Sequence, residues 1–77
     1  MPHIELKVYP GYDREKLEKL SSYIVDGVEQ ILNVPNSVIS LAIEEVTPGN
    51  WDANVYQPLI CGREMLLKSP NYFAEND

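Results

Sequence analysis

The sequence contains a single cysteine, Cys61, among its 77 residues. One cysteine cannot form a disulfide within its own chain and suits a reducing compartment, so we interpret Cys61 as a small packed residue. The one histidine, His3, has no cysteine or histidine cluster around it in the sequence, which argues against a structural zinc site. A single domain of this length buries only about 60% of its unfolded surface. Self-association is therefore the expected source of additional stability.

Basic residues and long apolar runs are also scarce. The six basic and twelve acidic side chains leave a net charge of −6, which argues against a nucleic-acid or anionic-membrane surface. One local cation could still bind a small anionic substrate. No apolar run approaches the ~20 residues of a membrane span, and the alternation of Glu5 and Lys7 with apolar residues excludes a signal peptide. We therefore expect a soluble cytoplasmic protein.

Two segments have the pattern of β-strands. Residues 3–9 alternate between apolar and polar side chains, which is the period of a strand with one buried face. Pro10-Gly11 ends this strand. Residues 38–43 are almost continuously apolar, which is typical of a strand covered on both faces, and residues 44–46 extend it to the edge.

Between these segments the spacing of apolar residues predicts a helix. Asp13 is the expected N-cap, and the helix should end near Asn33, because Pro35 discourages helical geometry at the preceding residue. One apolar stripe recurs at spacings of three and four residues: Leu17, Leu20, Ile24, Val28, Ile31 and Leu32. Strand, helix and strand form a βαβ unit, whose crossover should be right-handed and whose strands should be parallel.

The predicted βαβ unit leaves one face of its sheet bare. Two strands alone are barely stable in water, so we expect the sheet to continue in another subunit. Further along, residues 47–50 are interpreted as a loop and residues 57–68 as a partly helical segment. Residues 69–73 should be extended, and residues 74–77 should fray.

Proline follows the initiator methionine. A small second residue permits removal of Met1, which would leave Pro2 with a free secondary amine. An α-amino group titrates at about 7.7–8.0, and burial beside apolar groups lowers that value. A base tuned in this way can take a proton from carbon next to a carbonyl. The alternative is that Pro2 simply begins an edge strand, which tolerates the missing N–H.

Several short motifs accompany the βαβ pattern: Met1-Pro2-His3-Ile4, Tyr9-Pro10-Gly11, Leu32-Asn33-Val34-Pro35, Val38 to Ile43, and Glu44-Glu45 before a loop that ends in Trp51. In this combination the chain resembles the 4-oxalocrotonate tautomerase family from residue 2 to about residue 51. The resemblance implies an α+β fold in which two βαβ units pair into a four-stranded ferredoxin-like sheet across a dimer. Residues 1–77 would form one tautomerase-like domain. The longer C-terminal part resembles that of dimeric bacterial members, so a homodimer is expected rather than a hexamer.

The resemblance also implies a site. Pro2 matches the family's catalytic proline, which shuttles a proton between carbon and oxygen of an enolisable 2-keto acid without a metal or cofactor. Trp51 matches an aromatic position of the substrate pocket. The family's two substrate-binding arginines fall at Tyr12 and Ser40, which leaves these residues and the nearby Arg14 as candidates for binding the substrate. An arylpyruvate or a 2-hydroxydienoate is the expected substrate.

Each of these residues has a simpler interpretation. Trp51 could pack in the core or at a dimer contact, and Arg14 could pair with Glu18 on the helix surface. Tyr12 and Ser40 could be polar surface residues. His3 faces away from the core-side residues of its strand, and it could form a hydrogen bond near the site or be solvated.

Two other functions remain open at this point. If Met1 stays attached, the Pro2 nitrogen is an amide without a basic lone pair, and the chain would be a non-catalytic binding protein on the same fold. Hydration or dehalogenation of an unsaturated acid would use the same proline. That chemistry normally depends on the arginines that this sequence lacks.

Overall fold

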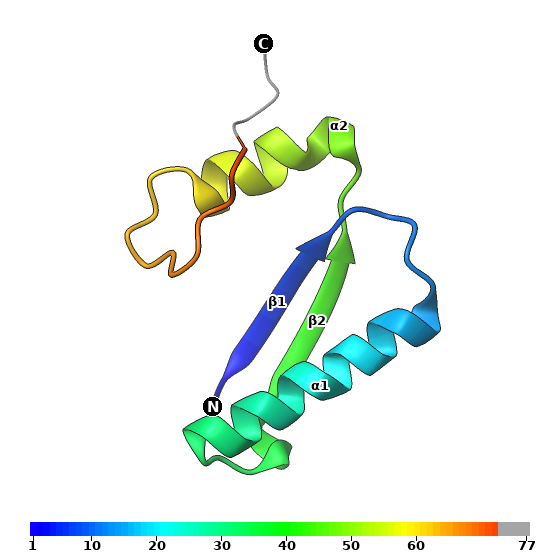
Figure 1. The fold of residues 1–77 in the computed structure, drawn as a ribbon, viewed down its shortest axis with the longest axis vertical. Helices are drawn as coiled ribbons and strands as arrows, with labels where there is room; N and C mark the ends of the chain where they lie inside the picture. Colours follow the sequence, from blue (N-terminus) through cyan, green and yellow to red (C-terminus); the bar gives the residue numbers. More distant parts are fainter. Residues whose placement is uncertain (73–77) are drawn as a thin grey trace. The chain divides into compact units, whose positions relative to one another are not determined.

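The computed structural model describes residues 1–72 and contains two compact units, Met1–Glu45 and Val46–Asp77. The first unit contains strand β1 (His3–Val8), helix α1 (Arg14–Leu32) and strand β2 (Ser40–Glu45). The strands are parallel, in a register that pairs His3 with Ser40 and Val8 with Glu45. Helix α1 comes between the two strands in the sequence. In space it lies alongside both of them (Figure 1). The predicted α+β class and βαβ order are confirmed.

The ends of α1 follow from local chemistry. The Asp13 side chain accepts a hydrogen bond from the Lys16 amide at 2.8 Å, which satisfies one free donor of the first turn, as predicted. At the other end Asn33 adopts a left-handed conformation with φ 57°, a conformation that asparagine tolerates better than most residues. Helix α1 therefore ends at Leu32, three residues before Pro35.

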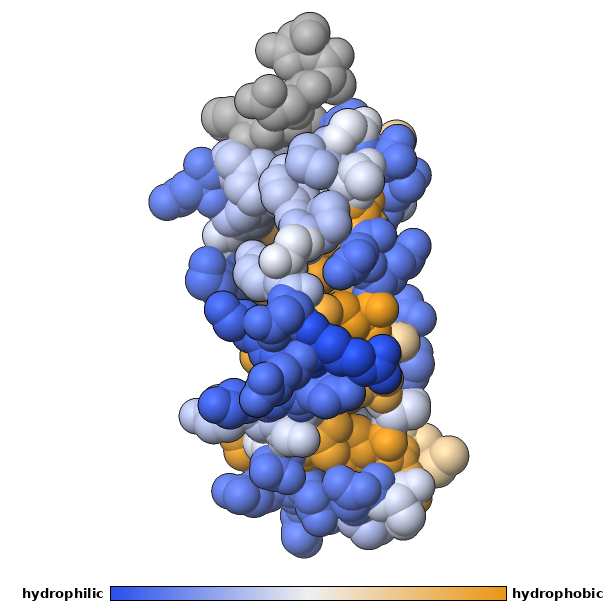
Figure 2. Space-filling view, turned by 90° about the vertical axis from the view of Figure 1, so that its right-hand side faces the viewer, coloured by the Kyte–Doolittle hydropathy of each residue, from blue (hydrophilic) through white to orange (hydrophobic). Residues whose placement is uncertain are grey.

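The apolar stripe of α1 is covered only in part. Leu17, Ile24 and Val28 are half-buried, whereas Ile31 is 84% exposed and Leu32 is 59% exposed. The 19 residues of α1 span about 28 Å, but the six residues of each strand span only about 20 Å. The helix is thus longer than the sheet beside it. Figure 2 views the molecule from the right-hand side of Figure 1 and shows apolar patches between hydrophilic side chains.

The second strand differs from its prediction in two respects. Asn36–Val38 forms a 3₁₀ turn, closed by a hydrogen bond from the Ile39 amide to the Asn36 carbonyl at 3.1 Å, and β2 begins only at Ser40. Within this chain the strand is covered on one face, because Leu41 and Ile43 are half-buried while Ala42 is exposed. The uncovered face carries His3, Glu5 and Lys7 of β1 opposite Ser40, Ala42 and Glu44 of β2.

The second unit is helical where a loop was predicted. Helix α2 (Pro48–Trp51) continues directly into a π-helical segment, η2 (Asp52–Ile60). Proline is favoured in the first turn of a helix, because its missing N–H has no partner there. Residues 57–68 are partly helical, as predicted: the helical part ends at Ile60, and Gly62 then takes the left-handed φ of +70° that glycine permits. Residues 69–72 form neither helix nor strand, while Phe73 and the predicted fraying of residues 74–77 lie outside the described residues.

Few side chains in the described part of the chain are fully buried. Val46 is 5% exposed and Val55 is 4% exposed, and these two residues make up the buried core of residues 1–72. No helix within residues 1–72 is long and apolar enough to cross a membrane.

Candidate functional site

The amino-terminal end of the sheet brings Pro2 and Ser40 together. The Ser40 amide donates a hydrogen bond to the Pro2 carbonyl at 3.2 Å, and this bond continues the parallel ladder beyond His3. On the uncovered face, His3 Nδ1 lies 2.7 Å from Ser40 Oγ, and His3 Nε2 lies 3.3 Å from Glu5 Oε2. The sequence placed His3 on this face, but only the strand register places it opposite Ser40.

Met1 is not part of the strand. Met1 is 96% exposed, and β1 begins only at His3. Removing Met1 would therefore leave the ladder of the sheet intact and would place the Pro2 nitrogen at the start of a rigid element. The expected amine is compatible with this geometry.

The carboxyl end of the strands holds the other two candidates from the first unit. Tyr12 and Arg14 line a groove of about 630 Å³, together with Leu17, Glu18, Ser21, Leu41, Ile43, Glu44 and Glu45. Arg14 Nε donates to Glu18 Oε2 at 2.9 Å, so the simpler surface pairing of Arg14 is present. The lining of the groove combines leucine and isoleucine side chains with three glutamates and one arginine.

Pro2 and the Tyr12–Arg14 pair lie at opposite ends of the first unit. Pro2 precedes β1 and Tyr12 follows it, so the length of a six-residue strand, about 20 Å, separates the two positions. One small substrate cannot contact both groups within a single chain. Tyr12 and Arg14 of the same chain are therefore poor replacements for arginines that would act on a substrate at Pro2.

A charged pair that the sequence analysis did not identify joins the two strands. The Lys7 ammonium donates to the Glu44 carboxylate across the register pair on the uncovered face. This hydrogen bond and the charge of Glu44 raise the pKa of Lys7 above its ordinary value of 10.5, although partial burial opposes the shift. Only the register could have shown the pair, since 37 residues separate its members.

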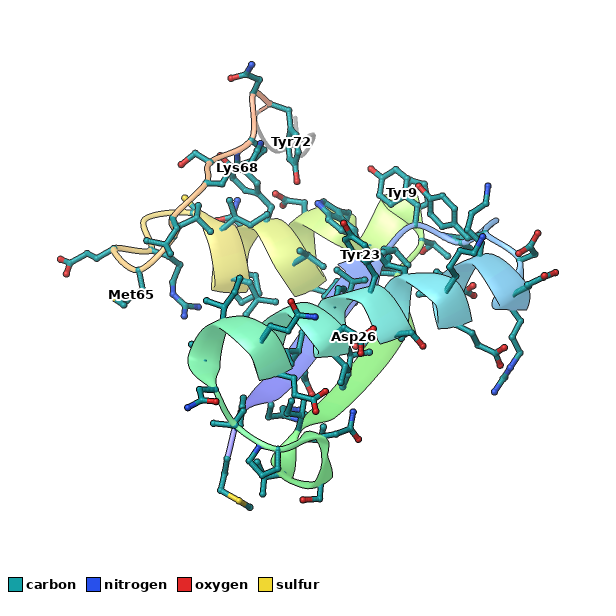
Figure 3. The ribbon with its side chains drawn as sticks, turned by 60° about the horizontal axis from the view of Figure 1, so that its bottom comes forward. Tyr9, Tyr23, Asp26, Met65, Lys68 and Tyr72 are labelled. Carbon is teal, nitrogen blue, oxygen red and sulfur yellow. The ribbon has the colours of Figure 1, made fainter. Side chains whose placement is uncertain are left out.

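Trp51 belongs to an aromatic cluster in the second unit. Its indole Nε1 donates to the Tyr72 hydroxyl at 3.0 Å, and the Tyr72 ring lies 5.9 Å from the Tyr56 ring at an interplanar angle of 42°. Figure 3 shows Tyr72 on the C-terminal segment, with its ring directed toward the helical part of this unit. Trp51 is thus half-buried and bonded to Tyr72 within this unit. Nearby Cys61 is exposed, so its interpretation as a packed residue is wrong.

Residues 1–72 offer no group of three or more His, Cys, Asp or Glu side chains that could hold a metal ion. The side chains at the amino-terminal end offer an imidazole, a hydroxyl and a carboxylate, and removal of Met1 would add the Pro2 amine. These groups can transfer protons and form hydrogen bonds to an anion.

The parallel βαβ unit lies within the part of the chain that matches a known family. Residues 2–55 match the family model described as "Tautomerase enzyme", and the chain belongs to this family. It is 33% identical over 73 residues to Tautomerase PptA of Escherichia coli O139:H28, covering 94% of this chain and 97% of that protein. Tautomerase PptA of Escherichia coli K12 strain DH10B gives the same identity and covers 95% of its own length. The protein is a tautomerase-type isomerase.

Solved structures agree with this fold. TomN, a 4-oxalocrotonate tautomerase homologue in the tomaymycin biosynthetic pathway, superposes with a TM-score of 0.63 at 20% identity, over 65% of this chain and 77% of its own. SAR1376 of methicillin-resistant Staphylococcus aureus gives a TM-score of 0.59 at 32% identity, over 61% and 76%. The likeness to TomN supports the fold alone.

Proposed function

We propose that this protein interconverts the keto and enol forms of a 2-keto acid, such as an arylpyruvate or a 2-hydroxydienoate, with the Pro2 amine as general base and acid. The observation that carries this proposal is the position of Pro2. It lies at the start of a strand, and its carbonyl is held by the Ser40 amide at 3.2 Å while Met1 stays outside the sheet. Loss of Met1 would create a fixed secondary amine.

The proposed reaction needs only a proton carrier and hydrogen-bond donors. The neutral amine removes a proton from the carbon next to the keto group, which leaves an enolate. The resulting ammonium returns the proton to oxygen and gives the enol, and the same steps in reverse ketonise the enol. No metal or cofactor is required for this exchange, since the proton leaves and returns through one nitrogen.

A homodimer would complete the site. Pairing of two units into a four-stranded sheet about a two-fold axis sets neighbouring strands antiparallel, so the carboxyl end of one unit lies beside the amino end of the other. Tyr12 and Arg14 of the partner subunit would then approach Pro2, which the same chain cannot achieve across about 20 Å. The uncovered edges of the two-stranded sheet support this arrangement.

Trp51 is proposed as the aromatic wall of the pocket. Its indole ring is half-buried and is tethered through Nε1 to Tyr72. An aromatic ring held in one orientation suits an arylpyruvate better than a small aliphatic acid, because it offers a flat apolar surface at little entropic cost.

Pro2→Ala tests the proposed catalyst. We expect the variant, with Met1 removed, to ketonise phenylenolpyruvate at least about a hundredfold more slowly, the typical contribution of a general base. Alanine leaves a primary amine of different geometry and basicity, while Pro2 makes no amide hydrogen bond that the change could break. The assay follows enol absorbance, and intact mass confirms removal of Met1 in both proteins.

Two results would contradict the proposal. A Pro2→Ala variant with full activity would remove Pro2 from the mechanism. A wild-type chain that lacks Met1 and is inert toward phenylenolpyruvate would exclude the arylpyruvate class. A chain that retains Met1 and gains activity when a peptidase removes it would support the amine directly.

A further inference from the structure

Three side chains beside Pro2 form a continuous hydrogen-bonded series, which we call the relay. Glu5 Oε2 lies 3.3 Å from His3 Nε2, and His3 Nδ1 lies 2.7 Å from Ser40 Oγ. The relay crosses from β1 to β2 on the face opposite α1, at the register pair that adjoins Pro2. Both strands hold their members rigidly, since the Ser40 amide is itself bonded to the Pro2 carbonyl.

The protonation of His3 decides what Ser40 can offer to a ligand. An ionised Glu5 only accepts hydrogen bonds, so His3 Nε2 carries a hydrogen toward it. In the neutral imidazole, Nδ1 is then an acceptor and takes the hydrogen of the Ser40 hydroxyl. In the imidazolium, Nδ1 donates to Ser40 Oγ instead, and the hydroxyl hydrogen is free to point at a ligand.

We propose that His3 and Ser40 form the recognition site for the substrate's carboxylate, and that binding there places a proton on His3. This inference rests on the proposed function for the identity of the acid. A carboxylate that leaves water needs donors and a compensating charge. The protonated relay supplies the Ser40 hydroxyl as a donor, and the charge of the His3 imidazolium offsets that of the Glu5 carboxylate beside it.

The charges around the relay favour this assignment. The net charge of −6 disfavours an anion, and a proton on His3 removes the local excess of negative charge that Glu5 leaves beside Ser40. On its own strand His3 faces Glu5, and from β2 it faces the uncharged Ser40. The next charged pair on this face, Lys7 with Glu44, lies four register pairs further along and is self-neutralised. After loss of Met1, the positive charges of a protonated Pro2 amine and of the His3 imidazolium would repel each other. Carboxylate binding is favoured at low pH, where His3 is protonated, whereas base catalysis is favoured at high pH, where the Pro2 amine is neutral.

The test measures binding of an unreactive acid to the chain that lacks Met1. Cinnamate and its neutral analogue cinnamamide are titrated by calorimetry at about pH 6 and about pH 8.5, in buffers with different ionisation enthalpies. Cinnamate should bind about tenfold more tightly at the lower pH, with net proton uptake at the higher pH. Cinnamamide should show neither effect, because it carries no charge.

Variants separate the relay from general electrostatics. His3→Gln keeps hydrogen-bonding groups but cannot take up a proton, so it should abolish the pH dependence and weaken cinnamate binding about tenfold at the lower pH. Ser40→Ala should weaken cinnamate binding by a similar factor. Lys7→Gln is the matched control, because it removes a cation from the same face outside the relay and should keep the wild-type ratio between the two pH values.

The outcomes distinguish this site from the proposed function. A His3→Gln variant with wild-type pH dependence and proton uptake would overturn the inference, and so would a wild type that binds no cinnamate. Ketonisation of phenylenolpyruvate is measured on the same samples. Ketonisation activity together with cinnamate binding that does not depend on His3 would support the proposed function and contradict the His3–Ser40 site. Cinnamate binding that depends on His3, without ketonisation activity, would support the site and contradict the proposed function.

Discussion

The uncovered face of the sheet carries two pairs of polar side chains that bond across the strands. From Pro2 onward it carries a histidine bonded to a serine and then a lysine bonded to a glutamate. An exposed polar face of this kind would not pack against another apolar surface. It therefore suits ligand binding at one end and solvent along the rest.

The Lys7–Glu44 pair predicts a loss of stability at high pH. The pKa of Lys7 is raised by its hydrogen bond to Glu44, so the folded state holds this proton more tightly than the unfolded state does. The contribution is fully present below the ordinary value of 10.5 and is lost as pH rises through the folded-state pKa. Urea unfolding at about pH 9 and about pH 11.5 should show a larger loss in wild type than in Glu44→Gln.

Glu45→Gln provides the control for this pair. It removes a neighbouring carboxylate from the same strand, but Glu45 pairs with Val8 in the register rather than with Lys7. Ionisation of the tyrosines affects all three proteins alike and cancels in the comparison. An equal loss in wild type and Glu44→Gln would show that the pair adds nothing to folding.

At the scale of elements, the C-terminal segment is joined to the helical segment by aromatic contacts. Tyr72 lies on the segment that follows η2 and contacts Trp51 and Tyr56 of the helical part. The π-helical end of this part places the Cys61 amide on the Tyr56 carbonyl at 2.7 Å, a bond one residue longer than in an α-helix.

Tyr72→Phe tests whether the hydroxyl holds this segment. The variant keeps the ring that contacts Tyr56 but removes the acceptor for Trp51 Nε1, so unfolding free energy should fall by about 1 kcal/mol. Trp51 is the one tryptophan, and its emission reports the change directly. Tyr23→Phe is the control, because Tyr23 projects from α1 and is 80% exposed (Figure 3). A stability and emission spectrum equal to wild type in Tyr72→Phe would contradict the tether.

At the scale of the whole molecule, one copy buries very little. Val46 and Val55 are the buried side chains among residues 1–72, while Ile31 at 84% and Leu67 at 97% are largely exposed. Burial of apolar surface is the main favourable term in folding. A chain of this size therefore needs to bury more apolar surface than a single copy does. This argument supports the proposed homodimer independently of the site.

Self-association predicts that stability depends on protein concentration. A folded dimer in equilibrium with unfolded chains gains stability by mass action, so the midpoint of urea unfolding should rise when the concentration is raised about a hundredfold. Light scattering after size-exclusion chromatography should give twice the chain mass at the higher concentration. A midpoint that does not move, together with the mass of a single chain, would exclude the dimer.

Much of the first unit could be predicted from the sequence, because its signals are local. The alternation of residues 3–9, the capping side chain of Asp13 and the proline after Asn33 each act over a few residues, and the strand–helix–strand order follows from them. The start of β2 could not be predicted in this way. The 3₁₀ turn at Asn36–Val38 takes in Val38, an apolar residue that would equally suit a strand.

The sequence by itself determined the βαβ order, the N-terminal proline and the shortage of basic residues, since these depend on neighbours in the chain. Only the tertiary structure decided that Ser40 lies beside Pro2 and opposite His3, and that Arg14 lies at the far end of the strands. It also decided that Trp51 meets Tyr72. These contacts join residues 21 to 38 positions apart, and their pairing depends on strand register and chain reversal, which no local pattern specifies.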